Sequence, residues 1–202
     1  GKPARGMLGV LVTVTAPFLL LIRGAVSLYH LGLPTWLALL VTAAATFGLL
    51  TGYGVVLSRL ITGRARVGFV AKWVAAPLVV GYCGFALLHL SRVNAKDDAV
   101  HAVYTATHPL LRLALTTLIL VDRKSVTTDL ARTPADYGRM GLRVNPRSAH
   151  YRQADGWVHA VDLRSAGPLP DVLVLWYFSA VGFETLRHGG TAYHLHVSLA
   201  MP

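Results

Sequence analysis

The chain has 202 residues, of which 54% are hydrophobic and only 14% are charged; this excludes an ordinary water-soluble protein and indicates a lipid bilayer. Its net charge of +10 is unevenly distributed, because residues 1–96 hold nine Lys and Arg and no acid, whereas all nine acidic residues follow. The later part is close to neutral. The charge therefore does not indicate a nucleic-acid-binding protein.

Three long apolar stretches come first in the chain, over residues 7–30, 34–58 and 68–91. A helix needs about 20 apolar residues to cross the hydrocarbon of a bilayer, and each stretch meets that length. Since two more spans follow the first, and Arg23 lies late within it, we expect it to stay attached and not to be cleaved as a signal peptide. The sequence predicts a three-helix transmembrane anchor over residues 1–95.

The basic residues around these stretches predict the orientation of the anchor. Lys2 and Arg5 precede the first stretch, and the link between the second and third carries Arg59, Arg64 and Arg66. Positive charge favours the cytoplasmic side and also attracts membrane lipid head groups. We therefore expect a multi-pass protein of the cytoplasmic (inner) membrane, with a cytoplasmic N-terminus and a periplasmic or extracellular C-terminal domain over residues 96–202.

Several residues inside the stretches leave the question of membrane partners open. Arg23 and Lys72 fit either a buried partner in a larger membrane complex or long side chains that reach the interface. Glycines allow close helix packing at positions 48, 52 and 54. The single cysteine, Cys83, lies in the third stretch, so a disulfide framework and a cysteine metal site are excluded.

The C-terminal part reads as one compact α+β domain. We expect helices over residues 108–120 and 170–182, where His101 and His108 cap or decorate a helix. We expect strands over residues 125–132, 157–164, 183–188 and 192–200, with a polar loop over 133–148. The last two strands should form a hairpin whose turn contains Gly189 and Gly190.

Candidate metal ligands occur in three short sequence motifs of this domain: SAH at 148–150, HAVD at 159–162 and HLH at 194–196. Imidazole and carboxylate groups are ligands that zinc accepts. On a strand His194 and His196 point to the same face, whereas His159 and Asp162 point to opposite faces. Only one residue of the latter pair should therefore reach a shared site.

SAHY, HAVDL and GFETLRHGGTAYHLHVSLA together resemble the zinc-binding sequence of the D-Ala-D-Ala carboxypeptidase and endopeptidase superfamily and of Hedgehog signalling domains. The resemblance covers about residues 106–201. It implies a zinc-peptidase-like fold in which His150, Asp162 and His196 bind zinc. HPLLRLAL followed by TTDLAR looks like that family's helix and its strand ending in arginine, which places Arg132 at the substrate-binding arginine.

The resemblance implies a bacterial, membrane-anchored zinc peptidase that acts on peptidoglycan peptides at the outer face of the cytoplasmic membrane. In that chemistry zinc polarises the scissile carbonyl and supplies hydroxide, a carboxylate moves protons, and Arg132 stabilises an oxyanion or a substrate carboxylate.

Two features depart from the family pattern. Eleven residues separate His150 from Asp162, more than the family usually has, which leaves His159 as a competing ligand. The family's proton-shuttling glutamate is replaced by the acid-free stretch HGGTAY. Asp155 and His194 are the candidates to replace this base, while Glu184, the only glutamate, fits a structural role.

The missing glutamate keeps a second interpretation open. On this interpretation the chain is a catalytically inactive accessory or structural subunit of a larger integral membrane complex, with the peptidase-like fold used for docking. Three spans, where one would tether an enzyme, favour that interpretation.

Overall fold

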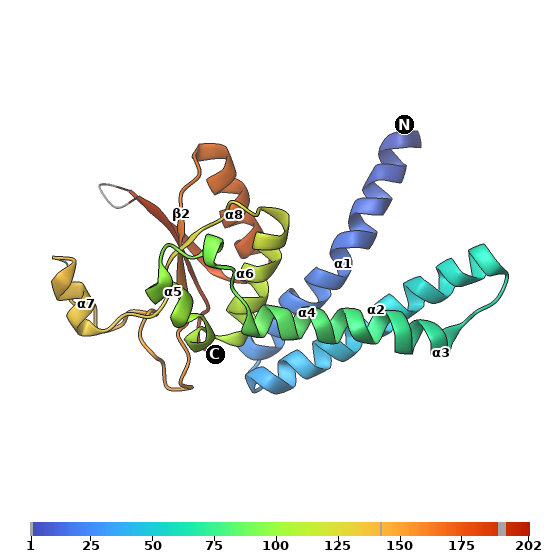
Figure 1. Cartoon of the computed structure of the whole chain (residues 1–202), viewed down its shortest axis with the longest axis horizontal. Helices are drawn as coiled ribbons and strands as arrows, with labels where there is room; N and C mark the ends of the chain where they lie inside the picture. The colour runs from blue at the N-terminus through green and yellow to red at the C-terminus, as the bar shows by residue number, and fades with distance from the viewer. Residues whose placement is uncertain (1, 142, 190–192) are drawn as a thin grey trace. The chain divides into compact units, whose positions relative to one another are not determined.

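The computed structural model describes residues 2–141, 143–189 and 193–202. The chain divides into two compact units, Gly1–Phe85 and Ala86–Pro202, called here the membrane unit and the C-terminal unit (Figure 1). The sequence places the division at residue 95. In the structure the C-terminal unit begins earlier, inside the last turns of the third apolar helix.

Three helices of the first part are long and apolar enough to cross a membrane, over Gly9–His30, Thr35–Thr62 and Val67–Leu88. This agrees with the three predicted stretches and indicates a membrane protein. The corresponding elements are α1 (Lys2–His30), α2 (Thr35–Thr62) and a third helix built from α3 (Val67–Val70), the π-turn η1 (Ala71–Ala75) and α4 (Ala76–Leu88).

Helices α1 and α2 pack together along apolar faces, with Ile22 and Ala25 fully buried. Buried hydroxyls need partners where water is absent, and Thr42 and Thr46 on α2 donate to the carbonyls of Ala38 at 2.9 Å and of Thr42 at 2.8 Å. The hydroxyl groups of these threonines therefore find their hydrogen-bond acceptors within their own helix.

One of the three predicted packing glycines of α2 lies at a close helix contact. A Cβ atom on Gly54 would overlap Cγ1 of Val70 in α3. In the described part of the chain, a Cβ on Gly48 or Gly52 would meet nothing within 4 Å. Close packing thus depends on position 54.

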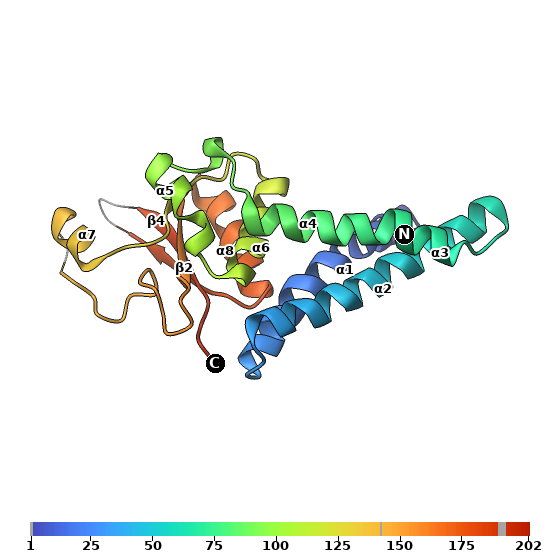
Figure 2. The ribbon, with the colours of Figure 1, turned by 60° about the horizontal axis from the view of Figure 1, so that its bottom comes forward.

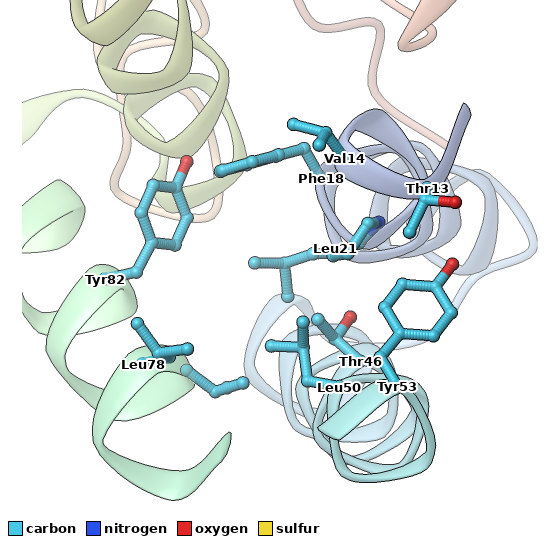
Figure 3. A pocket seen from close by; sticks show the side chains of 11 residues that line it. Thr13, Val14, Phe18, Leu21, Thr46, Leu50, Tyr53, Leu78 and Tyr82 are labelled. Carbon is cyan, nitrogen blue, oxygen red and sulfur yellow. The ribbon is translucent and has the colours of Figure 1, made fainter. Parts of the chain in front are cut away.

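A cavity of about 430 Å³ opens within the membrane unit between α1, α2 and α4 (Figure 3). Phe18 and Tyr82 meet edge to face, with ring centroids 5.5 Å apart, and Leu21, Leu50 and Leu78 point into the space between the three helices. The lining is almost wholly hydrocarbon, as expected for a space between membrane spans.

The C-terminal unit contains a four-stranded antiparallel sheet in the order β1-β2-β4-β3. The strands are β1 (Thr127–Asp129), β2 (Ala160–Arg164), β3 (Glu184–His188) and β4 (His194–Ser198). The helices are α5 (Asp98–Ala102), α6 (Pro109–Val121), α7 (Pro134–Arg139) and α8 (Pro168–Ala180), with 3-10 turns η2 (Arg92–Asn94) and η3 (Tyr104–Ala106). This is the mixed helix-and-sheet class that the sequence predicts.

Most predicted elements are present with shifted ends. The predicted helices correspond to α6 and α8, and the final hairpin corresponds to β3 and β4. Strand β1 is shorter than predicted, and β2 begins only at Ala160. Gly190 of the predicted turn lies outside the described residues.

The polar loop predicted over 133–148 was wrong in part, because it contains the short helix α7. Thr133 precedes Pro134, and Asp136 accepts a hydrogen bond of 2.6 Å from the Thr133 amide. Proline at the first position and an acid three residues after a threonine are both helix-start signals, and they outweigh the polar composition of the segment.

The two faces of the sheet differ in chemistry because neighbouring side chains alternate. Val161, Leu163, Leu195 and Val197 are buried on one face, where α8 packs on β3 and β4. Helices α6 and α8 lie on this side of the sheet, and α7 lies on the other (Figures 1 and 2). The opposite face carries Asp162 and several histidines.

Candidate metal centre

The strand register places one aspartate and three histidines on the polar face of the sheet. Asp162 on β2 pairs with His196 on β4, and His188 on β3 pairs with His194 on β4. Residues directly opposite one another in an antiparallel pair share a face, as do residues two apart on one strand. The fourth histidine, His150, comes from the loop that precedes β2.

His150, Asp162 and His196 offer ligand atoms that all lie within 4.8 Å of one another. Asp162 Oδ1 is 3.2 Å from His150 Nε2 and 2.8 Å from His196 Nδ1. Two ligands bonded to a tetrahedral zinc at about 2.0–2.1 Å are roughly 3.3 Å apart. The three residues assigned to zinc by the resemblance are therefore brought together at distances that suit a metal ion.

The hydrogen-bond pattern of His150 fixes which nitrogen faces Asp162 with a lone pair. Nδ1 lies 2.5 Å from the carbonyl oxygen of Leu130, and since a carbonyl only accepts, Nδ1 carries the proton. In the neutral ring Nε2 then directs its lone pair at the Asp162 carboxylate, which also carries lone pairs. Such a contact requires a proton or a cation between the two atoms. A Nδ1–H bonded to a backbone carbonyl is the usual support of a metal-binding histidine.

Asp162 is held in its anionic form. Its side chain is 2% exposed. Burial raises the pKa of this carboxyl, but its close contacts with His150 and His196 and the positive charge of Arg132 outweigh burial and hold the pKa well below its usual range. An ionised carboxylate is the form that binds a metal.

Arg132, which the sequence resemblance assigns to substrate binding, lies beside this group and binds its aspartate. Its guanidinium donates to Asp129 Oδ2 at 2.6 Å and to Asp162 Oδ2, and its charge lies 5.6 Å from the centre of the Tyr137 ring. Because Arg132 takes Oδ2, the other oxygen of Asp162 is directed at His150 and His196.

His194 and His188 extend the group toward solvent. His194 Nε2 lies 3.6 Å from Asp162 Oδ2, and its side chain is 24% exposed. The rings of His188 and His194 stack with centroids 4.6 Å apart, and His188 lies 5.9 Å from the ring of His196. Burial, followed by the charges of His194 and His196, lowers the pKa of His188. Sequence reasoning missed His188, although the hairpin register that pairs it with His194 was a usable signal.

Asp155, a predicted replacement for the catalytic base, belongs to a different group in the structure. Its Oδ2 lies 2.8 Å from His159 Nε2 and 3.8 Å from His108 Nε2. The loop turns at Gly156, whose φ is 84°, and this turn carries Asp155 back to His159. His159 and Asp162 thus lie in separate groups, as strand alternation predicts, and His108 caps α6 by accepting from the Leu110 amide.

Glu184 lies at the other end of β3 from His188 and is exposed. Comparisons of the chain with known protein families, with characterised proteins and with solved structures find no match.

Proposed function

We propose that the chain is a membrane-anchored zinc hydrolase that cleaves peptides, with His150, Asp162 and His196 as the metal ligands. The observation that carries the proposal is the contact between His150 Nε2 and Asp162 Oδ1 at 3.2 Å, with Nδ1 of the same ring committed to Leu130. Two histidines and one carboxylate leave a fourth tetrahedral position for water, the ligand set of catalytic zinc sites.

Zinc at such a position polarises a carbonyl and lowers the pKa of bound water. The protein groups around it have separable tasks. Arg132 fixes the orientation of Asp162, and His194 is placed to accept a proton because it is close to Asp162 and reachable by solvent. His188 stacks on His194 and limits the orientations of that ring.

The substrate class rests on two supports. The sequence resemblance implies cell-wall peptides ending in D-Ala-D-Ala. Lys2 and Arg5 before the first span, and the three arginines between the second and third, favour a C-terminal unit outside the cytoplasmic membrane. Peptidoglycan lies in that compartment in bacteria. The predicted location of the C-terminal unit is therefore consistent with the proposed substrate.

The test uses the full chain purified in detergent, stripped with a chelator and reconstituted with zinc. We expect cleavage of synthetic peptides ending in D-Ala-D-Ala or of peptidoglycan fragments, lost with chelator. His196→Ala should lower kcat/KM at least about 100-fold, since it removes a metal ligand. His30→Ala, a histidine at the end of α1 and outside the group, is the matched control and should retain activity.

Full zinc loading without cleavage of any such peptide would reject the hydrolase and leave the metal site standing. In that case the second candidate applies, an accessory subunit of a membrane complex. One observation favours it: only 17% to 28% of the residues in the most apolar windows of the three helices are buried within the structure. The remaining surface is available to lipid or to other membrane proteins.

The two candidates differ in what co-purifies with the chain. An accessory subunit extracted in a mild detergent should migrate as part of a larger complex with defined partners. A monomer that cleaves peptides on its own contradicts the accessory role.

A further inference from the structure

A second group of two histidines and one aspartate lies in the C-terminal unit, formed by His108, Asp155 and His159. Their ligand atoms also lie within 4.8 Å of one another. His108 stands at the N-terminus of α6, Asp155 in the loop before β2, and His159 directly before β2. His108 and His159 are fully buried, whereas the Asp155 side chain is 32% exposed.

We propose that His108, Asp155 and His159 bind a second zinc-like divalent cation, which fixes the long segment between His150 and Asp162 to the start of α6. This site is independent of the proposed hydrolase, and either can fail without the other.

The distances within the group suit a metal. Asp155 Oδ2 lies 2.8 Å from His159 Nε2 and 3.8 Å from His108 Nε2. These separations lie on either side of the roughly 3.3 Å expected between two ligands of a tetrahedral zinc. The longer one exceeds any hydrogen bond, so Asp155 and His108 face each other across a space without a direct bond between these atoms.

His159 repeats the pattern found at His150. Its Nδ1 lies 3.2 Å from the carbonyl oxygen of Leu199, so Nδ1 carries the proton and Nε2 of the neutral ring presents a lone pair to the Asp155 carboxylate. A cation between these two atoms resolves the contact and leaves the ring supported by a backbone carbonyl, as in metal sites.

His108 is held as a neutral ring, which is the ligand form. Its side chain is fully buried, and Nδ1 is unprotonated because it acts as an acceptor. Its Nδ1 accepts from the Leu110 amide at 3.3 Å, a long hydrogen bond. Metal binding at Nε2 moves the ring proton to Nδ1 and gives up this bond, a small loss beside the binding free energy of a structural zinc.

The backbone around the group is organised to deliver these ligands. The Val158 amide donates to Ala106 at 2.9 Å, and the His108 amide donates to Val158 at 2.8 Å. The Gln153 amide donates to Trp157 at 2.8 Å, which closes the turn that carries Asp155. Since the solvent side of the group is formed by Asp155, a water can complete the coordination there.

The buried histidines indicate a structural site. A substrate needs access to the metal, and here both rings are covered. The cation would join a loop to two elements distant in sequence, α6 and the segment at Leu199. This accounts for the length of the segment between His150 and Asp162, which provides two of the three ligands.

The stoichiometry of bound zinc tests the proposal. The full chain in detergent is stripped with chelator and dialysed against zinc, and protein-bound metal is measured by elemental mass spectrometry. We expect two zinc ions per chain for the unmodified protein and for His30→Ala, and one for either His159→Ala or His196→Ala. One zinc per chain that disappears in His196→Ala and persists in His159→Ala overturns the second site alone. One that persists in His196→Ala and disappears in His159→Ala supports the second site and contradicts the first.

Two further variants cover the case in which His159→Ala does not fold. Asp155→Asn changes a partly exposed side chain and keeps its shape; we expect it to bind one zinc. His159→Cys replaces one ligand by another, so the protein loaded with cobalt(II) should gain a thiolate-to-cobalt absorption band in the near ultraviolet. A folded Asp155→Asn that still binds two ions, or a folded His159→Cys without that band, contradicts the site.

Discussion

Two side chains of the C-terminal unit, Tyr104 and Arg112, donate hydrogen bonds to the last turn of α4. The Tyr104 hydroxyl donates to the carbonyl of Ala86 at 2.6 Å and lies 3.2 Å from Thr116 Oγ1. Arg112 donates to the carbonyl of Leu87. These carbonyls belong to the last turn of a helix, where no further amide of that helix reaches them. Burial raises the pKa of Tyr104 to about 12, so it stays a donor at all physiological pH values.

We expect Tyr104→Phe to lower the free energy of unfolding by about 1–3 kcal/mol, because it leaves a buried carbonyl without its donor. Tyr151→Phe is the matched control, since the buried Tyr151 hydroxyl has no hydrogen-bond partner among the described residues. Chemical unfolding of both variants in detergent measures the difference. Equal losses in the two variants would show that the Tyr104 hydrogen bond does not stabilise the fold.

Metal-site residues differ in how far the sequence reveals them. His150, Asp162 and His196 were predictable as metal ligands from short sequence motifs, and they lie together in the structure. Asp155 could not be placed, because the dipeptide Asp155-Gly156 signals a turn but does not show which residues the turn brings Asp155 against. The sequence predicts His108 as a helix cap, and the structure confirms this role. Its proximity to His159 arises only from the backbone pairing of residues 106–108 with Val158.

At the scale of elements, α7 exists because of its first turn. Asp136 accepts from the Thr133 amide at 2.6 Å and from the Thr133 hydroxyl at 2.8 Å, and it pairs with Arg139. The amide, the hydroxyl and Arg139, in that order, lower the pKa of Asp136 from 3.8 to about 2.

The sign of the resulting pH dependence follows from linkage. The unfolded chain takes up a proton at Asp136 below about pH 4, and the folded chain does so only near pH 2. Asp136 therefore stabilises the fold above pH 4, and this contribution is lost as the pH falls toward 2. Asp136→Asn should flatten this part of the stability profile. An unchanged slope of stability against pH between pH 4 and pH 2 would mean that the hydrogen bonds between Asp136 and Thr133 do not form.

The contact between α2 and α3 gives a prediction for the membrane unit. Gly54→Ala should lower the thermal stability in detergent, since the added methyl meets Val70 and overpacking costs about 1–3 kcal/mol. Gly52→Ala is the control on the same helix, because its added methyl meets open space. Equal midpoints for the two variants would contradict the close approach at Gly54.

Element types were predictable where the pattern was long or strongly alternating, as in the three apolar helices, α6, α8 and the β3–β4 hairpin. Ends were harder to predict. β2 begins at Ala160 because the preceding residues pair with the segment at Ala106, a long-range contact that residue preferences do not contain. Helix α7 was predictable from Thr133, Pro134 and Asp136, and composition obscured it.

At the scale of the whole molecule, the positions of the basic residues that flank the apolar helices predict the membrane topology. We expect a cysteine introduced as Ala154→Cys, in an exposed loop of the C-terminal unit, to react with a membrane-impermeant thiol reagent on intact cells. Thr62→Cys, near the link between α2 and α3, should react only after the cells are opened. Both variants are made in a Cys83→Ser background, since Cys83 is the only native cysteine. The reverse labelling pattern would place the C-terminal unit in the cytoplasm and remove cell-wall peptides as substrates.

The central claim is that a metal ion lies between His150, Asp162 and His196. Anomalous X-ray diffraction at the zinc absorption edge, from crystals of the zinc-reconstituted full chain, tests it most directly. We predict an anomalous peak about 2.0–2.2 Å from His150 Nε2, His196 Nδ1 and an oxygen of Asp162. Zinc-saturated crystals with ordered density for these three side chains and no anomalous peak between them would contradict the claim.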